Sequence, residues 1–295
     1  MASTQTGVLC AGLSCVDMML LNADTPVTME AITAFDGNRQ VAGGSCCNSS
    51  RVLAALKIRA VAVTLVGDDV QATLIRSQLE EGGVDTQYIR TESSINTSLA
   101  VLPVYTNGGR GCFVDLGANK VATPEKLLGR DFALLDRANC HIFHFGYPHL
   151  MKGIQGDNLA EMFAAARRHS MLVSLDVNGA NSPDFSILQS ALSSCFFFHA
   201  NLEEAATITG GTAIAEDKAT REEVIKLGEY FLAANAGIVS ISLGRHGAYL
   251  ATNKDPEVLK RTTDGRVKEA GGAMFRPAFA AAGPGNATAA GGSFV

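Results

Sequence analysis

Several features that often identify a class of protein are missing from this chain of 295 residues. No apolar run reaches the roughly 18 to 20 residues that span a bilayer, so we expect no membrane span. No basic stretch precedes an apolar one at the N-terminus, so we expect no signal peptide. There is no basic stripe either, because 24 basic and 29 acidic residues give a formal charge of −5. Nucleic acid is therefore not an expected partner.

The sequence also lacks a metal-binding or redox pattern of cysteines. Its seven cysteines are scattered, and their spacing matches neither a zinc site nor a CxxC pair. We expect reduced, mostly buried thiols, which indicates a cytoplasmic protein. His141, His144 and His149 do not predict a shared metal ion, because His141 and His144 face opposite sides of a strand. Structural or substrate-contacting roles are expected for them instead.

What the sequence does have is a core and a regular alternation of elements. Hydrophobic residues make up 47% of the chain and charged residues 18%. Apolar runs typical of parallel strands alternate with helical segments, which predicts an α/β fold with a mostly parallel central sheet flanked by helices. The strands are expected at 7–13, 60–67, 140–146, 171–176, 195–201 and 237–242, and the helices near 49–56, 68–81, 158–169 and 221–234.

The chain is expected to form a single domain over residues 1–295, since it has no internal repeat and no domain-separating linker. No G-x-G-x-x-G follows the first strand, which argues against a dinucleotide-binding dehydrogenase. The segments 97–105 and 111–115 break the alternation and predict a hairpin, because Asn107-Gly108 between them is a typical turn. With the irregular residues near 22–40, this hairpin is expected to form a small β-lid that excludes water from a site. Residues 253–273 are polar and are predicted to be irregular.

Candidate site residues follow the ends of the predicted strands. Asp17 comes just beyond the first strand, where open α/β sheets bind ligands, although an Asp there can also cap a helix or turn. Gly43 and Gly44 precede a helical run and let a ligand approach the backbone. Asn48, in the early turns of that helix, offers both a donor and an acceptor. We expect these four residues to line one polar pocket at the carboxyl ends of the sheet.

Further candidates lie in the second half of the chain. Asn178 follows the strand that ends at Asp176, and Asn201 and Glu204 stand three residues apart where a strand meets a helix. These two can arrange Mg²⁺ through water, but the residues alone favour an Asn cap with a capping-box Glu.

The last residues, 283–295, are rich in glycine and alanine. Small side chains leave the backbone N–H groups open, so a helix beginning near Ala289 to Gly292 would form an anion site. Composition alone favours a frayed tail.

Taken in order, these segments resemble the ribokinase-like (PfkB) family of carbohydrate kinases over nearly the whole chain. Each motif is weak alone, but seven in the family's order are specific: Gly12-Leu-Ser-Cys-Val-Asp17, Gly43-Gly44 with Asn48, Val66-Gly-Asp-Asp69, Gly82-Gly-Val-Asp85, Asp176-x-Asn178, Asn201-x-x-Glu204 and Leu243-Gly-x-x-Gly-Ala248. The resemblance implies ATP-dependent phosphorylation of a sugar or nucleoside hydroxyl, with ATP and Mg²⁺ as cofactors. It leaves open a homodimer formed through the β-lid.

The resemblance also implies roles for individual residues. Those that match the family's sugar-binding positions are Asp17, Gly43, Gly44 and Asn48. Those that match its nucleotide and Mg²⁺-phosphate positions are Asn178, Asn201, Glu204, Ser242, Gly244 and Gly247, with Glu204 acting on the metal indirectly through water. Gly244 and Gly247 also flank a tight turn, where backbone can approach a nucleotide.

The family's closing motif is Asp-x-Thr-Gly-Ala-Gly-Asp-Ser-Phe, and its counterpart here departs from it. Ala289, Ala290 and Gly291 take the anion-hole positions, and Gly292 takes the place of the Asp that accepts the proton of the acceptor hydroxyl. Because Gly292 cannot accept a proton, the resemblance predicts a sugar pocket with impaired transfer. The alternative is a catalytically inactive relative that binds a sugar or nucleoside. Two smaller departures are Ala180, where many members carry Arg, and the family's C-terminal helices, which have no counterpart before Val295.

Overall fold

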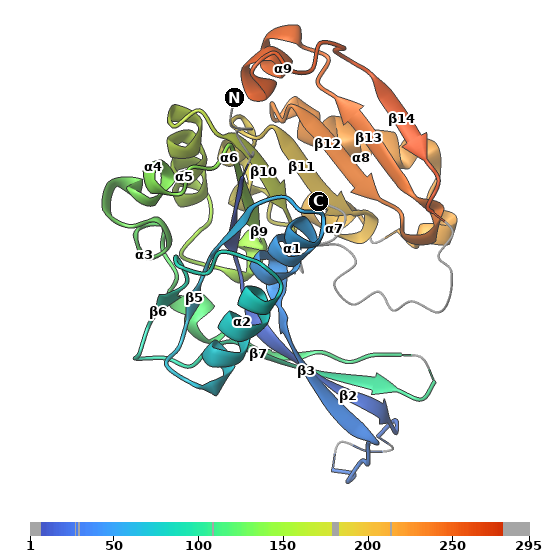
Figure 1. The fold of residues 1–295 in the computed structure, drawn as a ribbon. Helices are drawn as coiled ribbons and strands as arrows, with labels where there is room; N and C mark the ends of the chain where they lie inside the picture. Colours follow the sequence, from blue (N-terminus) through green and yellow to red (C-terminus); the bar gives the residue numbers. More distant parts are fainter. Residues whose placement is uncertain are drawn as a thin grey trace.

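The computed structural model describes residues 7–279 except 27, 29, 108, 179–182 and 213. Within them, an eight-stranded sheet has the strand order β14-β13-β12-β11-β10-β9-β1-β4 (Figure 1). The strands β4, β1, β9, β10, β11 and β12 run parallel, and β13 is antiparallel to both of its neighbours, β12 and β14. The predicted fold, a mostly parallel sheet flanked by helices, is confirmed. The bounds are β1 Val8–Gly12, β4 Ala60–Val63, β9 Ile142–Gly146, β10 Leu172–Asp176, β11 Phe197–Asn201, β12 Ile238–Ser242, β13 Ala248–Thr252 and β14 Ala273–Arg276.

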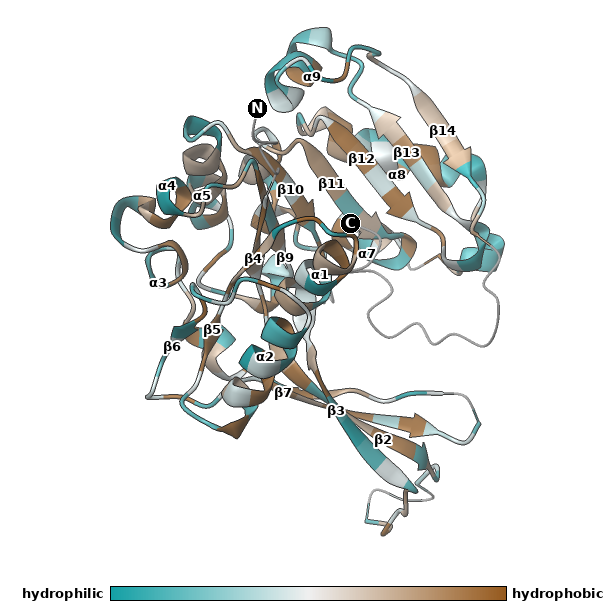
Figure 2. Cartoon of the chain, in the orientation of Figure 1, coloured by the Kyte–Doolittle hydropathy of each residue, from teal (hydrophilic) through white to brown (hydrophobic). Residues whose placement is uncertain are grey.

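Helices cover both faces of this sheet. On one face α1 (Gly44–Ala55) lies against β9, where Ser49 Oγ is 3.2 Å from His144 Nε2. On the other face α8 (Arg221–Ala233) packs Phe231 against Phe198 of β11, with ring centroids 4.4 Å apart. Because both faces are covered, the central strands are mostly apolar, as Figure 2 shows by the brown parts of strands such as β11 and β12.

The remaining helices around the main sheet are two longer ones and several short ones. The longer ones are α2 (Val70–Glu81), whose N-cap Asp69 accepts from the Ala72 N–H, and α5 (Asp157–Arg168). The short helices are α3 Pro124–Leu128, α4 Leu134–Arg137, α6 Gln189–Leu192 and α7 Leu202–Ile208, and the 3₁₀ turns are Gly117–Val121, Arg130–Phe132, Pro148–Leu150, Phe185–Ile187, Glu216–Lys218 and Gly244–His246. None of the helices in the described part of the chain is long and apolar enough to cross a membrane.

A second sheet of four strands, in the order β3-β2-β7-β8, projects away from the main sheet (Figure 1). It consists of β3 (Gly37–Gly43), β2 (Cys15–Ala23), β7 (Leu99–Tyr105) and β8 (Phe113–Asp115). The hairpin expected at 97–115 corresponds to β7 and β8, whereas residues 24–36 contain no strand among those described. The strand β2 was not predicted, because it is defined by pairing with β3 and β7, which are distant in sequence. A separate sheet of two parallel strands consists of β5 (Leu65–Val66), which comes soon after β4, and β6 (Arg90–Thr91).

The prediction that residues 253–273 are irregular is wrong. They contain α9 (Pro256–Thr263), and their last residue begins β14. The helix begins where Asp255 accepts a hydrogen bond of 2.9 Å from the Glu257 N–H, with Pro256 in the first turn. This Asp-Pro pair is a known start signal for a helix, so the sequence did contain the information. In contrast, the mostly exposed β14 has no apolar pattern from which it could be predicted.

Candidate functional site

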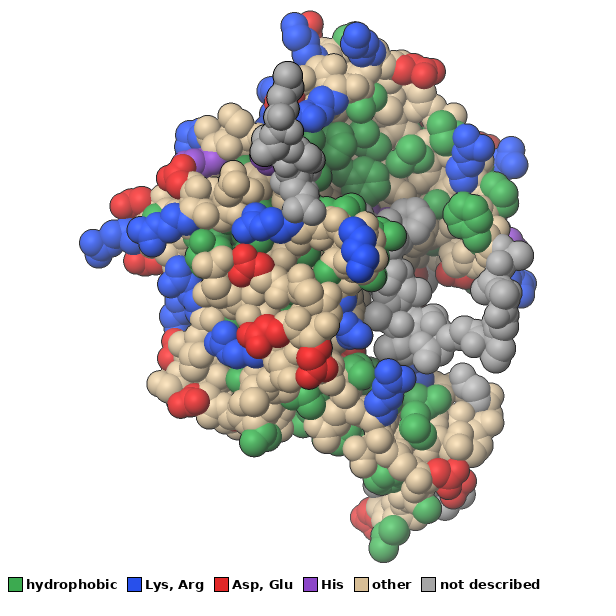
Figure 3. Space-filling model, in the orientation of Figure 1, with side chains coloured by type: hydrophobic (Ala, Val, Ile, Leu, Met, Phe, Trp, Pro, Cys, Tyr) green, Lys and Arg blue, Asp and Glu red, His purple; other side chains and the backbone are tan. Residues whose placement is uncertain are grey.

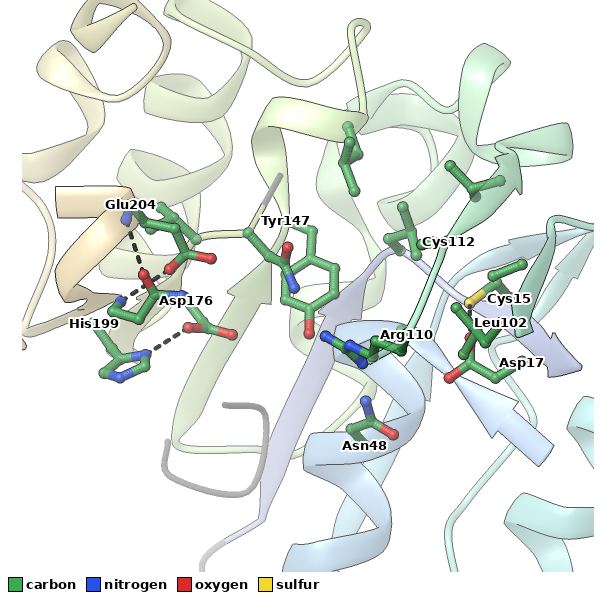
Figure 4. A pocket seen from close by; sticks show the side chains of 18 residues that line it. Cys15, Asp17, Asn48, Leu102, Arg110, Cys112, Tyr147, Asp176, His199 and Glu204 are labelled. Atoms are coloured by element: carbon green, nitrogen blue, oxygen red, sulfur yellow. Dashed lines mark hydrogen bonds and ion pairs between the residues drawn. The ribbon is translucent and has the colours of Figure 1, made fainter. Parts of the chain in front are cut away.

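A cavity of about 420 Å³ lies between the carboxyl ends of the main sheet and the inward face of the second sheet (Figure 4). Four parallel strands end at it: Leu13 follows β1, Tyr147 follows β9, and Asp176 and Asn201 end β10 and β11. The carboxyl ends of strands at which the order of connections changes are the usual ligand sites of open α/β sheets. The cavity is therefore the candidate ligand-binding site.

The first wall of the cavity is built around Asp17, which is part of β2. A Cβ atom on Gly43 would lie 2.2 Å from Asp17 Oδ2, so only glycine leaves room for this carboxylate beside the first turn of α1. Gly44, with φ +84°, then starts the helix, and Asn48 reaches the same cavity from its second turn. The positive end of a helix stabilises a nearby carboxylate. Asp17, Gly44 and Asn48 are thus brought together, with Gly43 directly beneath the carboxylate.

The Asp17 carboxylate is held in a partly apolar environment. Burial raises its pKa, while a hydrogen bond from the Cys15 thiol, 3.2 Å from Oδ1, and the positive charge of Arg110 oppose the rise. Cys15 is one of six buried free cysteines among the seven, which fits the prediction of mostly buried thiols. A buried carboxylate that accepts few hydrogen bonds is suited to accept them from hydroxyl groups of a ligand.

The opposite wall contains a buried pair that the sequence did not predict. His199 Nδ1 lies 2.7 Å from Asp176 Oδ1, and both side chains are about 97% buried, being 2% and 3% exposed. Tyr147 stands nearby, and burial raises the pKa of its hydroxyl well above the ordinary value, against a hydrogen bond with Asn178. The signal available for His199 was its place on β11 two residues before Asn201, which puts both side chains on the same face of the strand.

Asn201 and Glu204 form the capping box that the residues alone had favoured. The Asn201 side chain accepts from the Glu204 N–H at 2.8 Å, and Glu204 Oε2 accepts from the Asn201 N–H at 2.9 Å. Both residues also line the cavity, so the cap does not remove them from the site. Burial raises the pKa of Glu204 to about 8, opposed by the Asn201 N–H and supported by the negative charge of Asp176.

The pKa of Glu204 predicts a pH dependence of stability. Its folded-state value of about 8 lies above the ordinary 4.5, so the unfolded chain releases this proton first as the pH rises. The stabilisation is therefore complete below pH 4.5 and is lost as the pH rises through 8. Glu204→Gln keeps the capping hydrogen bonds but cannot ionise. Between pH 5 and pH 8 the free energy of unfolding of the unmodified chain should decrease as Glu204 ionises in the unfolded state. The decrease for the Glu204→Gln variant over the same interval should be smaller by about 2 to 4 kcal/mol.

Urea unfolding at a series of pH values measures this difference. Glu203→Gln is the matched control, because Glu203 is the exposed neighbour in the same helical turn. Equal pH slopes for the two variants would contradict the assignment of a raised pKa to Glu204.

The predicted nucleotide residues Ser242, Gly244 and Gly247 do not line this cavity. Leu243 and His246, in the same turn, line a second cavity of about 570 Å³. The turn needs its glycines for packing: a Cβ on Gly244 would lie 2.0 Å from Glu216 Oε2, and one on Gly247 would lie 1.9 Å from the Arg276 carbonyl oxygen. Both also have positive φ, 52° and 99°. The structure thus gives these glycines a reason that does not involve a nucleotide.

The positions predicted for phosphoryl transfer, Ala289, Ala290, Gly291 and Gly292, lie outside the described residues, as do Ala180 and Gly108. Of the other predicted site residues, those that line the first cavity are Asp17, Gly44, Asn48, Asn178, Asn201 and Glu204. His144, one of the three histidines, is buried between Ser49 and Ser174, with its Nδ1 3.1 Å from Ser174 Oγ. Burial lowers its pKa to about 4, so it is a neutral structural residue at pH 7.

Comparisons with known proteins agree with this architecture. Residues 5–295 match the family described as pfkB family carbohydrate kinase. The chain is 24% identical over 250 residues to the ribokinase of Staphylococcus aureus strain COL, covering 85% of this chain and 77% of that protein. It is 25% identical over 199 residues to the deoxyribokinase of Salmonella typhi, covering 68% of this chain and 61% of that protein.

The structure is similar to that of Arabidopsis thaliana ribokinase complexed with ribose and ATP. The TM-score is 0.76 at 21% identity, and the match covers 98% of this chain and 83% of the ribokinase chain. The two proteins therefore share a fold.

Proposed function

This chain belongs to the pfkB family of carbohydrate kinases, which are phosphotransferases with an alcohol group as acceptor, and we propose that it transfers the γ-phosphoryl group of ATP to a sugar hydroxyl. The observation that carries the proposal is the cavity in which Asp17 and Asn48 lie opposite Asp176 and Glu204. One wall offers acceptors and donors for hydroxyl groups, and the other offers carboxylates suited to a cation–phosphate pair. The names of the relatives, ribokinase and deoxyribokinase, favour a pentose over a hexose.

The roles of the first wall follow from its chemistry. The Asp17 carboxylate would accept hydrogen bonds from two neighbouring hydroxyl groups of the sugar, and the Asn48 amide would donate one and accept another. Such contacts orient the reacting hydroxyl toward the phosphoryl group, which is the main contribution that a protein makes to phosphoryl transfer. The second sheet, in the role of the β-lid, would exclude water, which otherwise competes as acceptor.

The other wall suits Mg²⁺. Its donors are the carboxylates of Asp176 and Glu204 and the amides of Asn178 and Asn201, and oxygen atoms are the ligands that Mg²⁺ prefers. Burial of the Glu204 carboxylate, which raises its pKa, would be offset by a nearby cation. When bound, Mg²⁺ neutralises charge on the phosphates of ATP. Ser242, Gly244 and Gly247 stay predictions for the nucleotide side, next to the second cavity.

A second function is favoured by one specific observation, the glycine at position 292. With no carboxylate there, the chain would bind a sugar or a nucleoside and transfer phosphate slowly or not at all. The pocket contacts of Asp17 and Asn48 do not involve this position, so binding and transfer can separate.

The second sheet also supports the proposal of a homodimer. Large hydrophobic side chains are exposed on it and on its loop, among them Leu21 at 38%, Phe35 at 46% and Phe113 at 69%. Hydrophobic side chains are visible at the tip of this sheet in Figure 3, at the lower end of the molecule. Burial of such side chains against a second copy would remove them from water. Above this tip, the face of the molecule drawn in Figure 3 carries both basic and acidic side chains.

The proposal is tested by measuring ATP-dependent phosphorylation and binding of a panel of pentoses, hexoses and adenosine. Product mass and ADP release report transfer, and calorimetry reports binding. A phosphorylated sugar supports the kinase, and binding without transfer supports the second function. If no member of the panel is bound or phosphorylated, the proposed function is wrong.

A further inference from the structure

His199 has no role in the proposed function, although it lines the cavity and is buried beside one of its carboxylates. Its Nδ1 lies 2.7 Å from Asp176 Oδ1, and the two side chains are 2% and 3% exposed. Removing a polar ring from water is unfavourable, so an apolar residue would serve packing alone better. The place of His199 therefore points to a role for its hydrogen bond.

The register of the main sheet puts the two side chains together. His199 of β11 is the direct partner of Asp176 of β10, and parallel neighbours in register point to the same face of a sheet. The backbone is held at the same level, because the Val177 N–H donates to the His199 carbonyl oxygen at 3.2 Å. The Tyr147 N–H donates to the Asp176 carbonyl oxygen at 3.0 Å. The separation of the pair is thus set by the rigid sheet and not by a loop.

The hydrogen bond fixes the orientation of the Asp176 carboxylate. His199 Nδ1 donates, since a carboxylate oxygen can only accept. A carboxylate held at one oxygen cannot turn freely about its last side-chain bond, which is otherwise a soft rotation. Figure 4 shows Asp176 between His199 and the middle of the cavity, with one oxygen at the imidazole and the other turned away from it. The second oxygen is therefore presented to a ligand in the cavity.

The other carboxylate of this wall is held in a similar way. Glu204 Oε2 accepts from the Asn201 N–H at 2.9 Å. Each of the two acids thus has one oxygen fixed by a protein donor. Carboxylates that bind metal ions are usually held by such outer hydrogen bonds, and loss of the outer donor typically weakens metal binding by about 10- to 100-fold.

We propose that His199 is a positioning residue for the cation that accompanies ATP: it holds one oxygen of Asp176 so that the other is available to Mg²⁺. This inference rests on the proposed function, since it concerns the cation side of the same cavity. His199 itself would not touch the cation, because the imidazole lies on the far side of the carboxylate (Figure 4). Its contribution should therefore appear in the part of nucleotide binding that depends on Mg²⁺, and not in sugar binding.

The test isolates the contribution of Mg²⁺ to nucleotide binding. The non-hydrolysable ATP analogue AMP-PNP is titrated by calorimetry with saturating Mg²⁺ and with EDTA, and the ratio of the two affinities is the gain due to the cation. In His199→Leu, which removes the donor at similar volume, this gain should fall by about 10- to 100-fold. In His199→Asn, whose amide nitrogen can take the place of Nδ1, it should stay within about 3-fold of the unmodified value. In both variants the affinities for sugar, and for AMP-PNP in EDTA, should change by less than about 3-fold.

His144→Leu is the matched control, because His144 is a buried histidine of the same sheet that makes two hydrogen bonds but does not line the cavity. It should lower the free energy of unfolding in urea without altering the gain due to Mg²⁺. If His199→Leu does not fold, His199→Gln takes its place. The longer glutamine keeps a polar group there, but its amide lies beyond the position of Nδ1.

The inference is overturned if the gain due to Mg²⁺ is unchanged in the variant without the donor, or if His199→Asn loses as much of it. It is also overturned if the affinity for sugar, or for AMP-PNP in EDTA, falls by the same factor as the gain. A third contrary result is that Mg²⁺ does not strengthen binding of AMP-PNP to the unmodified chain. In each of these cases the unmodified chain still binds sugar and the proposed function stands, whereas a chain that binds neither sugar nor AMP-PNP would reject both.

Discussion

Asp17→Ala is expected to weaken sugar binding by about 100-fold or more. The substitution removes a carboxylate that would accept hydrogen bonds from two hydroxyl groups, and a hydrogen bond to a charged group contributes about 1.5 to 3 kcal/mol. It also leaves the first turn of α1 without the negative charge beside it. Calorimetric titration with the sugar that binds most tightly in the panel measures the loss.

Two further variants make the result specific to the position of the carboxylate. Gly43→Ala would place a Cβ 2.2 Å from Asp17 Oδ2, so it should displace the carboxylate and share much of the defect. Asp24→Ala removes an exposed acid in the segment after β2 and should leave the affinity unchanged. Sugar affinity that is unaffected in Asp17→Ala would show that the sugar does not bind at this wall.

Gly292→Asp is expected to raise the rate of ATP-dependent sugar phosphorylation by about 100-fold or more. The position matches the family's proton acceptor, and general-base catalysis typically contributes about 10² to 10⁴ in rate. Residues 283–295 contain no Asp or Glu that can substitute for it. Affinity for the sugar should change little, because Asp17 and Asn48, which are proposed to bind it, are unchanged.

Gly292→Asn is the control, since the amide has nearly the same shape as the carboxylate but does not accept a proton at neutral pH. A second variant adds Asn286→Asp and Ala289→Gly, which restore the other family residues of this motif. If the unmodified chain already turns over at about 1 to 100 per second, an ordinary rate for kinases, the interpretation of Gly292 is wrong. It is also wrong if neither variant gains activity while the sugar still binds.

The parts of the fold that could be predicted are those with local signals. The strand β10 is mostly apolar, since helices cover both of its faces, and α2 begins at a capping Asp69 and ends before Gly82. The strand β2 was missed, because its partners lie 16 to 28 residues away in β3 and more than 80 residues away in β7, and its sequence continues the apolar run of β1. Pairing between distant segments is a property of the whole fold and leaves no local pattern.

The same distinction applies to the candidate site. Asp17 comes five residues after the end of β1 and Asn201 is the last residue of β11, so their place near the carboxyl edge could be predicted from order along the chain. Arg110 and Tyr147 could not, because one reaches the cavity from a hairpin and the other from a residue with φ +68° after β9. For Gly244 and Gly247 the sequence predicts space beside the backbone, and the structure adds that a Cβ at either position would meet Glu216 or Arg276. A glycine in the sequence shows that no side chain is present at that position, but not which neighbouring atoms lie there in the fold.

The central claim, that a sugar binds between the main sheet and the second sheet, is tested most directly by hydrogen exchange with and without the sugar that binds most tightly. We expect the sugar to slow exchange of the amides in β7, in β8 and in the first turns of α1, because both walls then close on one ligand. The helix α9 lies at the amino ends of the strands, where Thr262 contacts Gly237, and its exchange should not change. The claim would be contradicted if β7 and β8 were as protected as the central strands β9 and β10 and did not respond to the sugar.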